Sequence, residues 1–161
     1  MVYWENSSYY DNMTEHVYAK NKKAFFDYEI IEAYEAGIKL KGYEVKSVKK
    51  GLADLHGSFA IIRGGEAYLT NMSIPPYQKA NIPESYDEQR PRQLLLHKKQ
   101  IQELEERLKQ GGLTLIPLKL YNKKGLIKIE LGIARGKRKY DKREAIKKRE
   151  DERKMRRSLK R

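Results

Sequence analysis

The three histidines, His16, His56 and His97, are the only imidazoles available for acid–base or metal chemistry, and they stand far apart in the sequence. None has a second ligand at a metal-site spacing such as HxxxH, and the chain has no cysteine. The sequence also lacks a G-x-S-x-G motif, a Walker-type loop and a G-x-G-x-x-G loop. Convergent catalytic groups are therefore missing, and we expect a protein that is not an enzyme and holds no metal or cofactor.

Lysine and arginine supply the chemistry that histidine does not. The 161 residues carry a formal net charge of +13, which points to a polyanionic partner, most often nucleic acid. From Ala134 to Arg161 there are 15 basic and 5 acidic residues, so most of the excess lies in this segment. A solvated, disordered tail has the same composition.

An anionic membrane surface is the competing partner for such a segment. A membrane-bound helix needs a broad apolar face, but the only sizeable apolar residues after position 140 are Ile146, Met155 and Leu159. The first residues, MVYWENSSYY, have neither the basic nor the apolar region of a signal peptide, and no apolar run approaches the roughly 20 residues that span a bilayer. We therefore expect nucleic acid rather than membrane as the partner, and a cytoplasmic protein.

The elements that must position these charges are mostly strands. Alternating apolar residues predict a strand over 28–40, with Gly37 at a bulge or bend, and two further strands over 113–121 and 126–134. Gly64-Gly65 predicts a hairpin turn. Helices are predicted from Gly42 to the stop at Gly51, and from Leu94 to the Gly111-Gly112 pair, after a proline-rich loop over 75–92.

Hairpins in place of βαβ alternation predict a mainly β fold with some α-helix: a small antiparallel barrel, with a helix over an open end. We expect three segments. Residues 1–20 form a flexible N-terminal extension, 21–135 the folded barrel, and 136–161 a basic tail.

Four motifs in order resemble the family of SsrA-binding proteins, also called small protein B. They are YEAGIKLKGYEVKSVKKG (34–51), RPRQLLLHKK (90–99), IPLKLY (116–121) and ARGKRKYDKR (134–143), within a likeness that runs from residue 21 to the C-terminus. The resemblance implies an oligonucleotide-binding-like (OB-like) barrel. It also implies a monomeric, non-enzymatic protein that binds transfer-messenger RNA and brings it to stalled ribosomes for trans-translation.

The resemblance also implies which residues of the body face the RNA. Glu35 would accept hydrogen bonds from base N–H groups and so give selectivity, while Leu95 and His97 would pack on unstacked bases. Lys128 would contact phosphate. The full set is Tyr28, Glu35, Glu44, Lys46, Ser47, Leu95, His97, Lys98 and Lys128, of which Glu44, Lys46 and Ser47 also have an alternative role in shaping the short helix.

In the tail, the resemblance makes Gly136 a hinge and assigns the following residues to the decoding centre of the small ribosomal subunit and its message channel. These residues are Lys137, Arg138, Tyr140, Asp141, Lys142 and Arg143. We expect residues 141–161 to be disordered in the free chain and helical on the ribosome, because their 11 basic residues repel one another without a polyanion.

Two features depart from the family pattern. Phe25 stands where a basic residue is usual, and the tyrosine-rich first 20 residues do not resemble the short, lysine-rich start of the family. Two other functions fit parts of the sequence: a structural ribosomal protein with a basic extension into rRNA, and a nuclease on a small barrel. The absence of an acid or histidine cluster argues against the nuclease.

Overall fold

The structure, a computed structural model, describes residues 16–159, and for residues 139 and 140 it describes only the backbone. Its elements follow in chain order: β1 (Val17–Lys20), α1 (Lys22–Asp27), β2 (Tyr28–Ile38), α2 (Gly42–Lys49), β3 (Phe59–Arg63), β4 (Glu66–Thr70), the 3₁₀ turn η2 (Lys79–Asn81), β5 (Arg92–Leu95), α3 (Lys98–Lys109), β6 (Thr114–Lys123), β7 (Leu126–Gly136) and α4 (Lys139–Ser158). No helix within residues 16–159 is long and apolar enough to span a bilayer.

All strand pairs in the sheet are antiparallel, and six of the seven strands pair in a ring. The order runs β6-β3-β4-β5-β2-β7 and returns to β6, with β1 added outside on β6. The longest pairings in the ring are those of β7 with β2 and with β6. The shortest is between β3 and β6, where the single pair Ala60 and Leu115 closes the ring. The predicted mainly β, antiparallel fold is confirmed.

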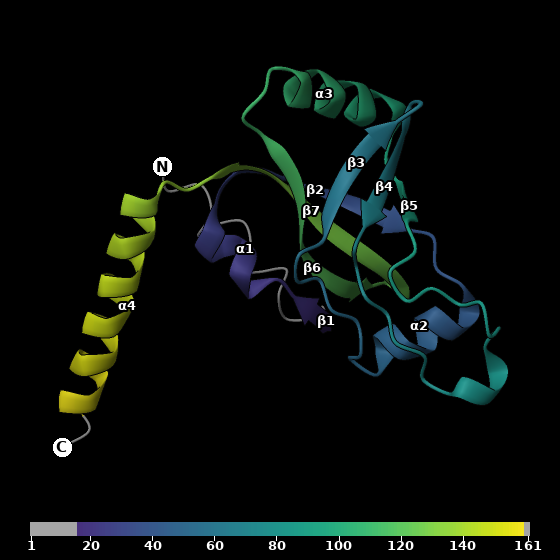
Figure 1. Cartoon of the computed structure of the whole chain (residues 1–161), viewed down its shortest axis with the longest axis horizontal. Coiled ribbons are helices and arrows are strands. Elements are labelled where there is room, and N and C mark those ends of the chain that lie inside the picture. Colours follow the sequence, from purple (N-terminus) through teal and green to yellow (C-terminus); the bar gives the residue numbers. More distant parts are fainter. Residues whose placement is uncertain (1–15, 160–161) are drawn as a thin grey trace.

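Helices lie at the two ends of this ring of strands, α3 over one end and α2 at the other (Figure 1). Each contributes one fully buried apolar side chain to the main core, Leu104 from α3 and Val48 from α2. The inward residues of β7, Ile129, Leu131 and Ile133, are also fully buried in that core. The apolar residues of β7 therefore alternate as expected, and one face of this strand packs into the core.

Several predicted elements are present with small changes of boundary. The hairpin turn at Gly64-Gly65 has φ of +60° and +73°, as a two-residue turn between right-twisted strands requires. The first long strand ends at Ile38 instead of residue 40. Its irregularity lies between Ile30 and Glu32, so the bulge predicted at Gly37 is wrong.

Two other predictions need correction. Leu94 does not begin a helix: it is a buried residue of β5, and α3 begins at Lys98. The predicted flexible extension over 1–20 is too long, because Val17–Lys20 form β1 on the edge of β6. Residues 1–15 of that extension lie outside the described part of the chain.

The short helix α1 was not predicted from the sequence, and a buried asparagine anchors it. The Asn21 side chain accepts a hydrogen bond from the Ala24 N–H at 3.1 Å and so caps the helix. Its amide group donates to the carbonyl of Pro117 at 3.0 Å and to that of Leu55 at 3.3 Å. One side chain thereby fixes the turn between β1 and α1 against β6.

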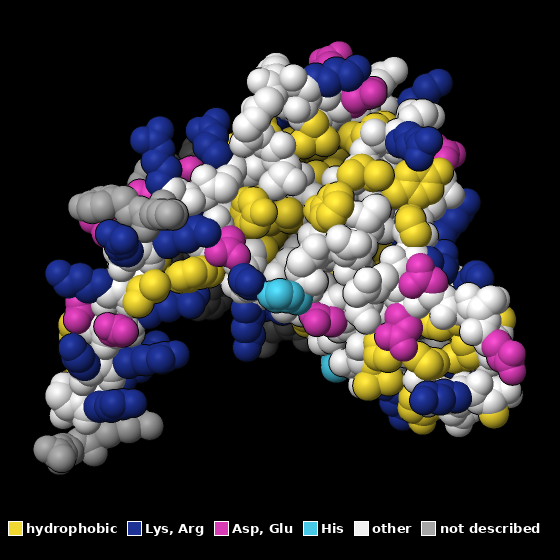
Figure 2. Space-filling model, in the orientation of Figure 1, with side chains coloured by type: hydrophobic (Ala, Val, Ile, Leu, Met, Phe, Trp, Pro, Cys, Tyr) yellow, Lys and Arg dark blue, Asp and Glu magenta, His cyan; other side chains and the backbone are white. Residues whose placement is uncertain are grey.

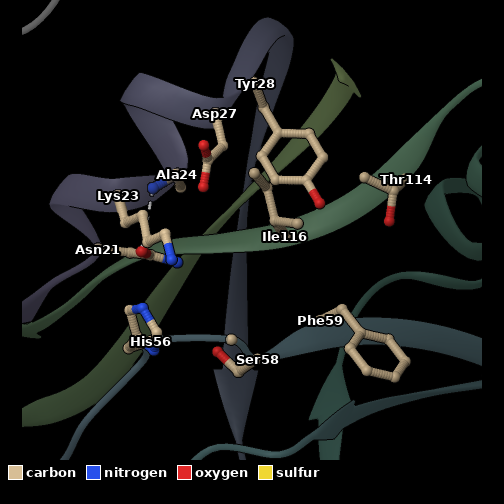
Figure 3. Close-up of a pocket in the computed structure, with 11 residues that line it drawn as sticks. Asn21, Lys23, Ala24, Asp27, Tyr28, His56, Ser58, Phe59, Thr114 and Ile116 are labelled. Carbon is tan, nitrogen blue, oxygen red and sulfur yellow. Dashed lines mark hydrogen bonds between the residues drawn. The ribbon is translucent and has the colours of Figure 1, made fainter. Parts of the chain in front are cut away.

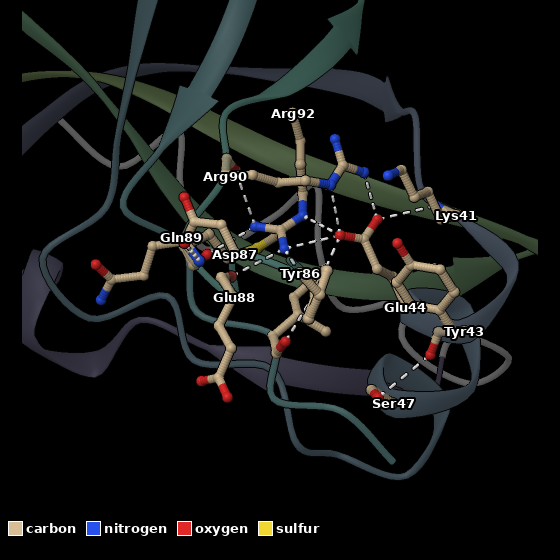
Figure 4. Close-up of polar contacts among 12 residues, drawn as sticks. Lys41, Tyr43, Glu44, Ser47, Tyr86, Asp87, Glu88, Gln89, Arg90 and Arg92 are labelled. Atoms are coloured by element: carbon tan, nitrogen blue, oxygen red, sulfur yellow. Dashed lines mark hydrogen bonds and ion pairs between the residues drawn. The ribbon is translucent and has the colours of Figure 1, made fainter. Parts of the chain in front are cut away.

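A buried ion cluster joins α2 to the loop before β5 (Figure 4). The Glu44 carboxylate and the Arg92 guanidinium are both fully buried, with Arg92 Nη2 2.9 Å from Glu44 Oε1. Arg90 Nη2 donates to Glu44 Oε2 at 2.6 Å, and the Lys41 N–H donates to the same oxygen at 2.8 Å. Arg92 also donates to the carbonyls of Met72 and Glu88, at 2.7 and 2.9 Å. Every buried side-chain donor and acceptor of this cluster thus has a partner.

Tyr86 completes the cluster from the same loop. Its hydroxyl lies 2.8 Å from the Ile74 carbonyl and 3.2 Å from Glu44 Oε1. Burial and the negative charge of Glu44 raise the pKa of Tyr86 to about 12. Burial alone would raise the pKa of Glu44, but the hydrogen bonds from Arg90, Lys41 and Arg92 outweigh it and lower that pKa. Glu44 therefore stays ionised inside the protein.

The tail is a single helix, α4, that extends away from the barrel (Figure 1). Basic side chains cover much of its length (Figure 2). It contacts α1 in its first turn and again at its middle: Lys142 pairs with Asp27 at 3.1 Å, and Arg149 lies 5.6 Å from the ring centre of Phe26. The tail is helical in this structure of the chain alone, and its helical form on the ribosome stays a prediction. Loss of the helix in the free chain stays a prediction.

We expect Glu44→Gln to destabilise the fold by roughly 3–5 kcal/mol, because it leaves the buried Arg92 charge without its counter-ion. Urea denaturation at pH 7 measures this, with Glu106→Gln on the exposed face of α3 as the control. The folded pKa of Glu44 lies below its ordinary value of 4.5. Its stabilisation is therefore complete above that pH and is lost as the pH falls through the folded pKa. A difference between wild type and Glu44→Gln that stays constant from pH 7 to pH 3 would contradict this account.

Candidate RNA-binding face

Glu35 lies on β2 with 40% of its side chain exposed, and two donors from β6 hold it in place. The Tyr121 hydroxyl and the Lys123 ammonium both donate to Oε2, the latter at 2.9 Å. Burial acts to raise the pKa of Glu35, but these hydrogen bonds, with the charges of Lys123 and Lys128, lower it overall. Glu35 is therefore a fixed, ionised acceptor.

The strand register brings two more predicted residues onto the same outer surface. Gly37 of β2 is opposite Leu95 of β5 on one side and Lys128 of β7 on the other. Lys128 is in turn opposite Tyr121 of β6. Because directly opposed residues point to the same face, Leu95, Lys128 and Tyr121 form a row across four strands. Glu35 stands two residues from Gly37 on that face.

Gly37 makes room for Leu95 in this row. A Cβ atom on Gly37 would lie 3.1 Å from Leu95 Cβ and 3.3 Å from Leu95 Cδ1, closer than side chains normally pack. Leu95 itself is 50% exposed, although it is a large apolar side chain at the centre of the surface. Gly37, where the sequence suggested a bulge or bend, pairs regularly with both neighbouring strands and leaves room for an exposed leucine beside it.

His97 and Lys98 follow at the edge of this surface. His97 is the residue before α3, and its main-chain N–H donates to the Gln100 side chain at 3.1 Å. Both His97 and Lys98 are exposed. We refer to Glu35, Leu95, His97, Lys98 and Lys128 as the outer face.

The other predicted body residues lie elsewhere. Glu44 and Ser47 are fully buried, so their predicted contact with RNA is wrong. Glu44 binds the two arginines, and Ser47 donates to the Tyr43 carbonyl at 3.3 Å within α2. Their alternative role, in shaping the short helix, is the one that the structure has. Lys46 of the same motif is exposed on α2.

Tyr28 is separated from the outer face by the length of β2, about 23 Å for seven residues. It lines a different pocket, between α1 and the start of β3, with His56 and Phe59 (Figure 3). In the register it lies opposite Gly136, the predicted hinge. Tyr28 therefore belongs with the base of the tail.

The predicted tail residues begin where β7 ends. The Lys137 N–H donates to the Asp27 carbonyl at 2.9 Å, and its ammonium donates to the Phe25 carbonyl at 3.1 Å. Asp141 accepts from the Arg138 N–H at 3.3 Å and so caps α4. Arg143 is exposed, and the side chain of Tyr140 lies outside the described part.

Phe25, the departure from the family pattern, contributes its main chain to this junction. Its ring is 40% exposed, with the Lys20 ammonium 5.8 Å from the ring centre. A carbonyl can accept from Lys137 whatever the side chain at position 25. The junction therefore does not need the basic residue that is usual there.

Comparison with known proteins decides the family. Residues 18–161 match the family described as SmpB protein. The chain belongs to the SmpB family. An SsrA-binding protein of Thermosipho africanus is 52% identical over 146 residues, which cover 90% of this chain and 97% of the relative. One of Caldicellulosiruptor bescii is 54% identical over 144 residues, 89% of this chain and 90% of the relative.

A solved structure extends the match to three dimensions. It is described as "tmRNA-SmpB: a journey to the center of the bacterial ribosome", and one of its chains is 50% identical to this SmpB-family chain. The TM-score is 0.62, with 79% of this chain and 92% of the other covered. The predicted family resemblance is confirmed.

The structure adds two residues that sequence reasoning missed, Tyr121 and Lys123. In the sequence, Tyr121 is the last residue of the IPLKLY motif, and Lys123 lies between the two strands predicted over 113–121 and 126–134. The signal that could have identified them is the pairing of the last two strands. Tyr121 lies opposite Lys128, already assigned to the RNA, so the two residues share a face.

We expect Tyr121→Phe to raise the pKa of Glu35 toward its ordinary value of 4.5, because a hydrogen bond that stabilises the carboxylate is lost. The pH dependence of the Glu35 carboxyl ¹³C chemical shift measures this. Tyr68→Phe is the matched control, since the Tyr68 hydroxyl also pairs with a glutamate, Glu66, but within β4 and away from Glu35. An unchanged Glu35 pKa in Tyr121→Phe would show that the tyrosine does not hold the carboxylate.

Proposed function

We propose that this chain binds transfer-messenger RNA and carries it to stalled ribosomes, where it takes part in trans-translation. It acts as an RNA-binding protein with no catalytic activity of its own, as a cytoplasmic monomer when free. The observation that carries the proposal is the match, at 50% identity and a TM-score of 0.62, to a chain from the tmRNA-SmpB structure.

The outer face supports this function by its chemistry. Glu35 repels phosphate, so its use against RNA is to accept from base N–H groups and select one RNA among many. Leu95 and His97 offer apolar and flat surfaces for unstacked bases, and Lys128 offers a charge for phosphate. The fixed acceptor provides selectivity, and the lysine provides attraction.

The tail supports the ribosomal part of the proposal. Fully helical, the 20 residues of α4 reach about 30 Å, long enough to run from a decoding site into a message channel. Its cations match RNA walls, whose phosphates would neutralise their mutual repulsion. We propose that Gly136 to Arg143 enter the decoding centre and that the remaining helix follows the message path.

The RNA that copurifies with the protein from its native cell tests the function. We expect sequencing to recover one structured, tRNA-like species, and Glu35→Ala to weaken its binding about tenfold, the value of a hydrogen bond to a charged group. Binding to an unrelated duplex should change less than about twofold. Glu105→Ala is the matched control: its carboxylate is 39% exposed and also pairs with a lysine.

Two outcomes would contradict the proposal. Equal losses on both RNAs would show that Glu35 is not a selectivity residue. Ribosomal RNA as the main copurifying species, with about one copy of the protein per ribosome after a salt wash, would favour a structural ribosomal protein.

Replacing Tyr140, Lys142 and Arg143 together by Ala tests the tail. We expect binding of transfer-messenger RNA to be spared, because the outer face is intact, and tagging of chains on non-stop messages to be lost. Tyr68, Lys99 and Lys109 replaced together by Ala remove one tyrosine and two cations from the body, as the tail variant does from α4, and serve as the control. Tagging at the wild-type level would exclude a decoding role, and loss of both activities would place the tail on the RNA-binding surface.

A further inference from the structure

A groove continues the outer face toward α2. It is open to solvent, has a volume of about 280 Å³, and lies between the ends of β2 and β5, the turn from β6 to β7, and α2. Leu95 and Lys128 of the outer face are part of its wall. The remaining wall comes from residues to which no function has been assigned, chiefly Leu40, Val45, Lys49 and Leu126.

The floor of the groove is apolar and stays in contact with water. Leu126 is 61% exposed and Leu95 is 50% exposed. A single exposed leucine needs no explanation, but here two face the same small space. Gly37 also lines the groove, and a Cβ atom at that position would lie 3.1 Å from Leu95 Cβ, so that Leu95 would have to shift by a few tenths of an ångström. The missing side chain on β2 therefore leaves Leu95 room beside the groove.

Positive charge surrounds this apolar floor. Lys49 enters from α2 and Lys128 from β7. The segment from residue 39 to 50 carries five lysines and a single acid, Glu44, whose charge is already neutralised by Arg90 and Arg92 inside the protein. An apolar ligand without charge would leave these cations unused. An apolar, planar group that carries a phosphate would satisfy both parts of the site.

We propose that this groove binds one unstacked nucleobase of the RNA, packed against Leu95 and Leu126, with Lys49 at the adjoining phosphate. The proposal rests on the proposed function and adds a subsite to it. The groove is smaller than the sites that hold drug-sized ligands, of roughly 300–1,000 Å³, so it suits a single base. A paired base cannot enter, so the occupant comes from a loop or bulge. Glu35 would then read a neighbouring nucleotide on the same surface.

Two substitutions separate the parts of the site. We expect Leu126→Ser to weaken binding of transfer-messenger RNA about fivefold, with no change in the slope of log K against log salt, since only base packing is lost. Lys49→Gln should weaken binding and reduce that slope by about one, as loss of one phosphate contact requires. Leu52→Ser and Lys109→Gln make the same changes at exposed positions outside the groove and should have neither effect.

Two further measurements secure the result. Leu126→Ile should restore binding, which loss of folding in Leu126→Ser would not predict. In the wild type, the methyl resonances of Leu95 and Leu126 should shift upfield on addition of the tRNA-like part of transfer-messenger RNA, because an aromatic base lies over them, and should not shift with an unrelated duplex.

The outcomes distinguish this inference from the proposed function. If wild type binds transfer-messenger RNA, but Leu126→Ser and Lys49→Gln bind equally well and the methyl resonances do not move, the groove is not a base site and the function stands. If wild type does not bind transfer-messenger RNA, the proposed function falls and the subsite falls with it.

Discussion

The buried Glu44 carboxylate is the interaction on which the rest of the surface depends. An ionised carboxylate and a guanidinium can be removed from water only when they pair closely and every donor is used. Here Arg90, Arg92 and the Lys41 N–H all converge on Glu44, and Arg92 also binds two carbonyls of the loop before β5. The cluster holds α2, the loop over 75–91 and the first residue of β5 in one arrangement.

That arrangement sets the geometry of the outer face. Arg92 begins β5, and Leu95 ends it three residues later. The position of Leu95 over Gly37 is therefore linked to the buried ions through a single short strand. On the other side of the groove, α2 carries Lys49 seven residues after it begins at Gly42. A charge cluster that RNA cannot reach thus positions side chains that RNA can reach. This explains why two residues of the GYEVKS motif, Glu44 and Ser47, are buried although the motif lies beside the outer face.

Local patterns predicted the parts of the fold that depend on local rules. The Gly64-Gly65 hairpin and the alternating β7 follow from φ preferences and from a period of two, and both are present. Leu94 was assigned to a helix because its spacing fits α3 as well, and only long-range pairing with Ile38 and Ala67 makes it a strand residue.

Contacts between residues far apart in the sequence could not be predicted. β1 and α1 are short, and Asn21 fixes them through contacts with Leu55 and Pro117, which lie far from it in the sequence. Likewise, nothing near Glu44 in the sequence reveals Arg90 and Arg92 as its partners. The family resemblance supplied Glu35, Leu95 and Lys128, which the register then brought together, whereas Tyr121 and Lys123 required the pairing of β6 with β7.

Body and tail both carry charge, and the contacts between their side chains are weak surface interactions. The pair Lys142–Asp27 and the contact of Arg149 with Phe26 lie at the surface, where each such interaction contributes at most about 1 kcal/mol and is weakened by salt. The main-chain bond from Lys137 to Asp27 is closer to the barrel and continues the β2–β7 ladder. Among the described residues of the tail, Lys137, beside Gly136, is therefore the one that is held most firmly. Beyond that point a polyanion that binds many cations at once offers far more than the two contacts with α1. A helix joined in this way can leave the body without disturbing the outer face, so that one end of the chain can select an RNA while the other follows a different RNA surface.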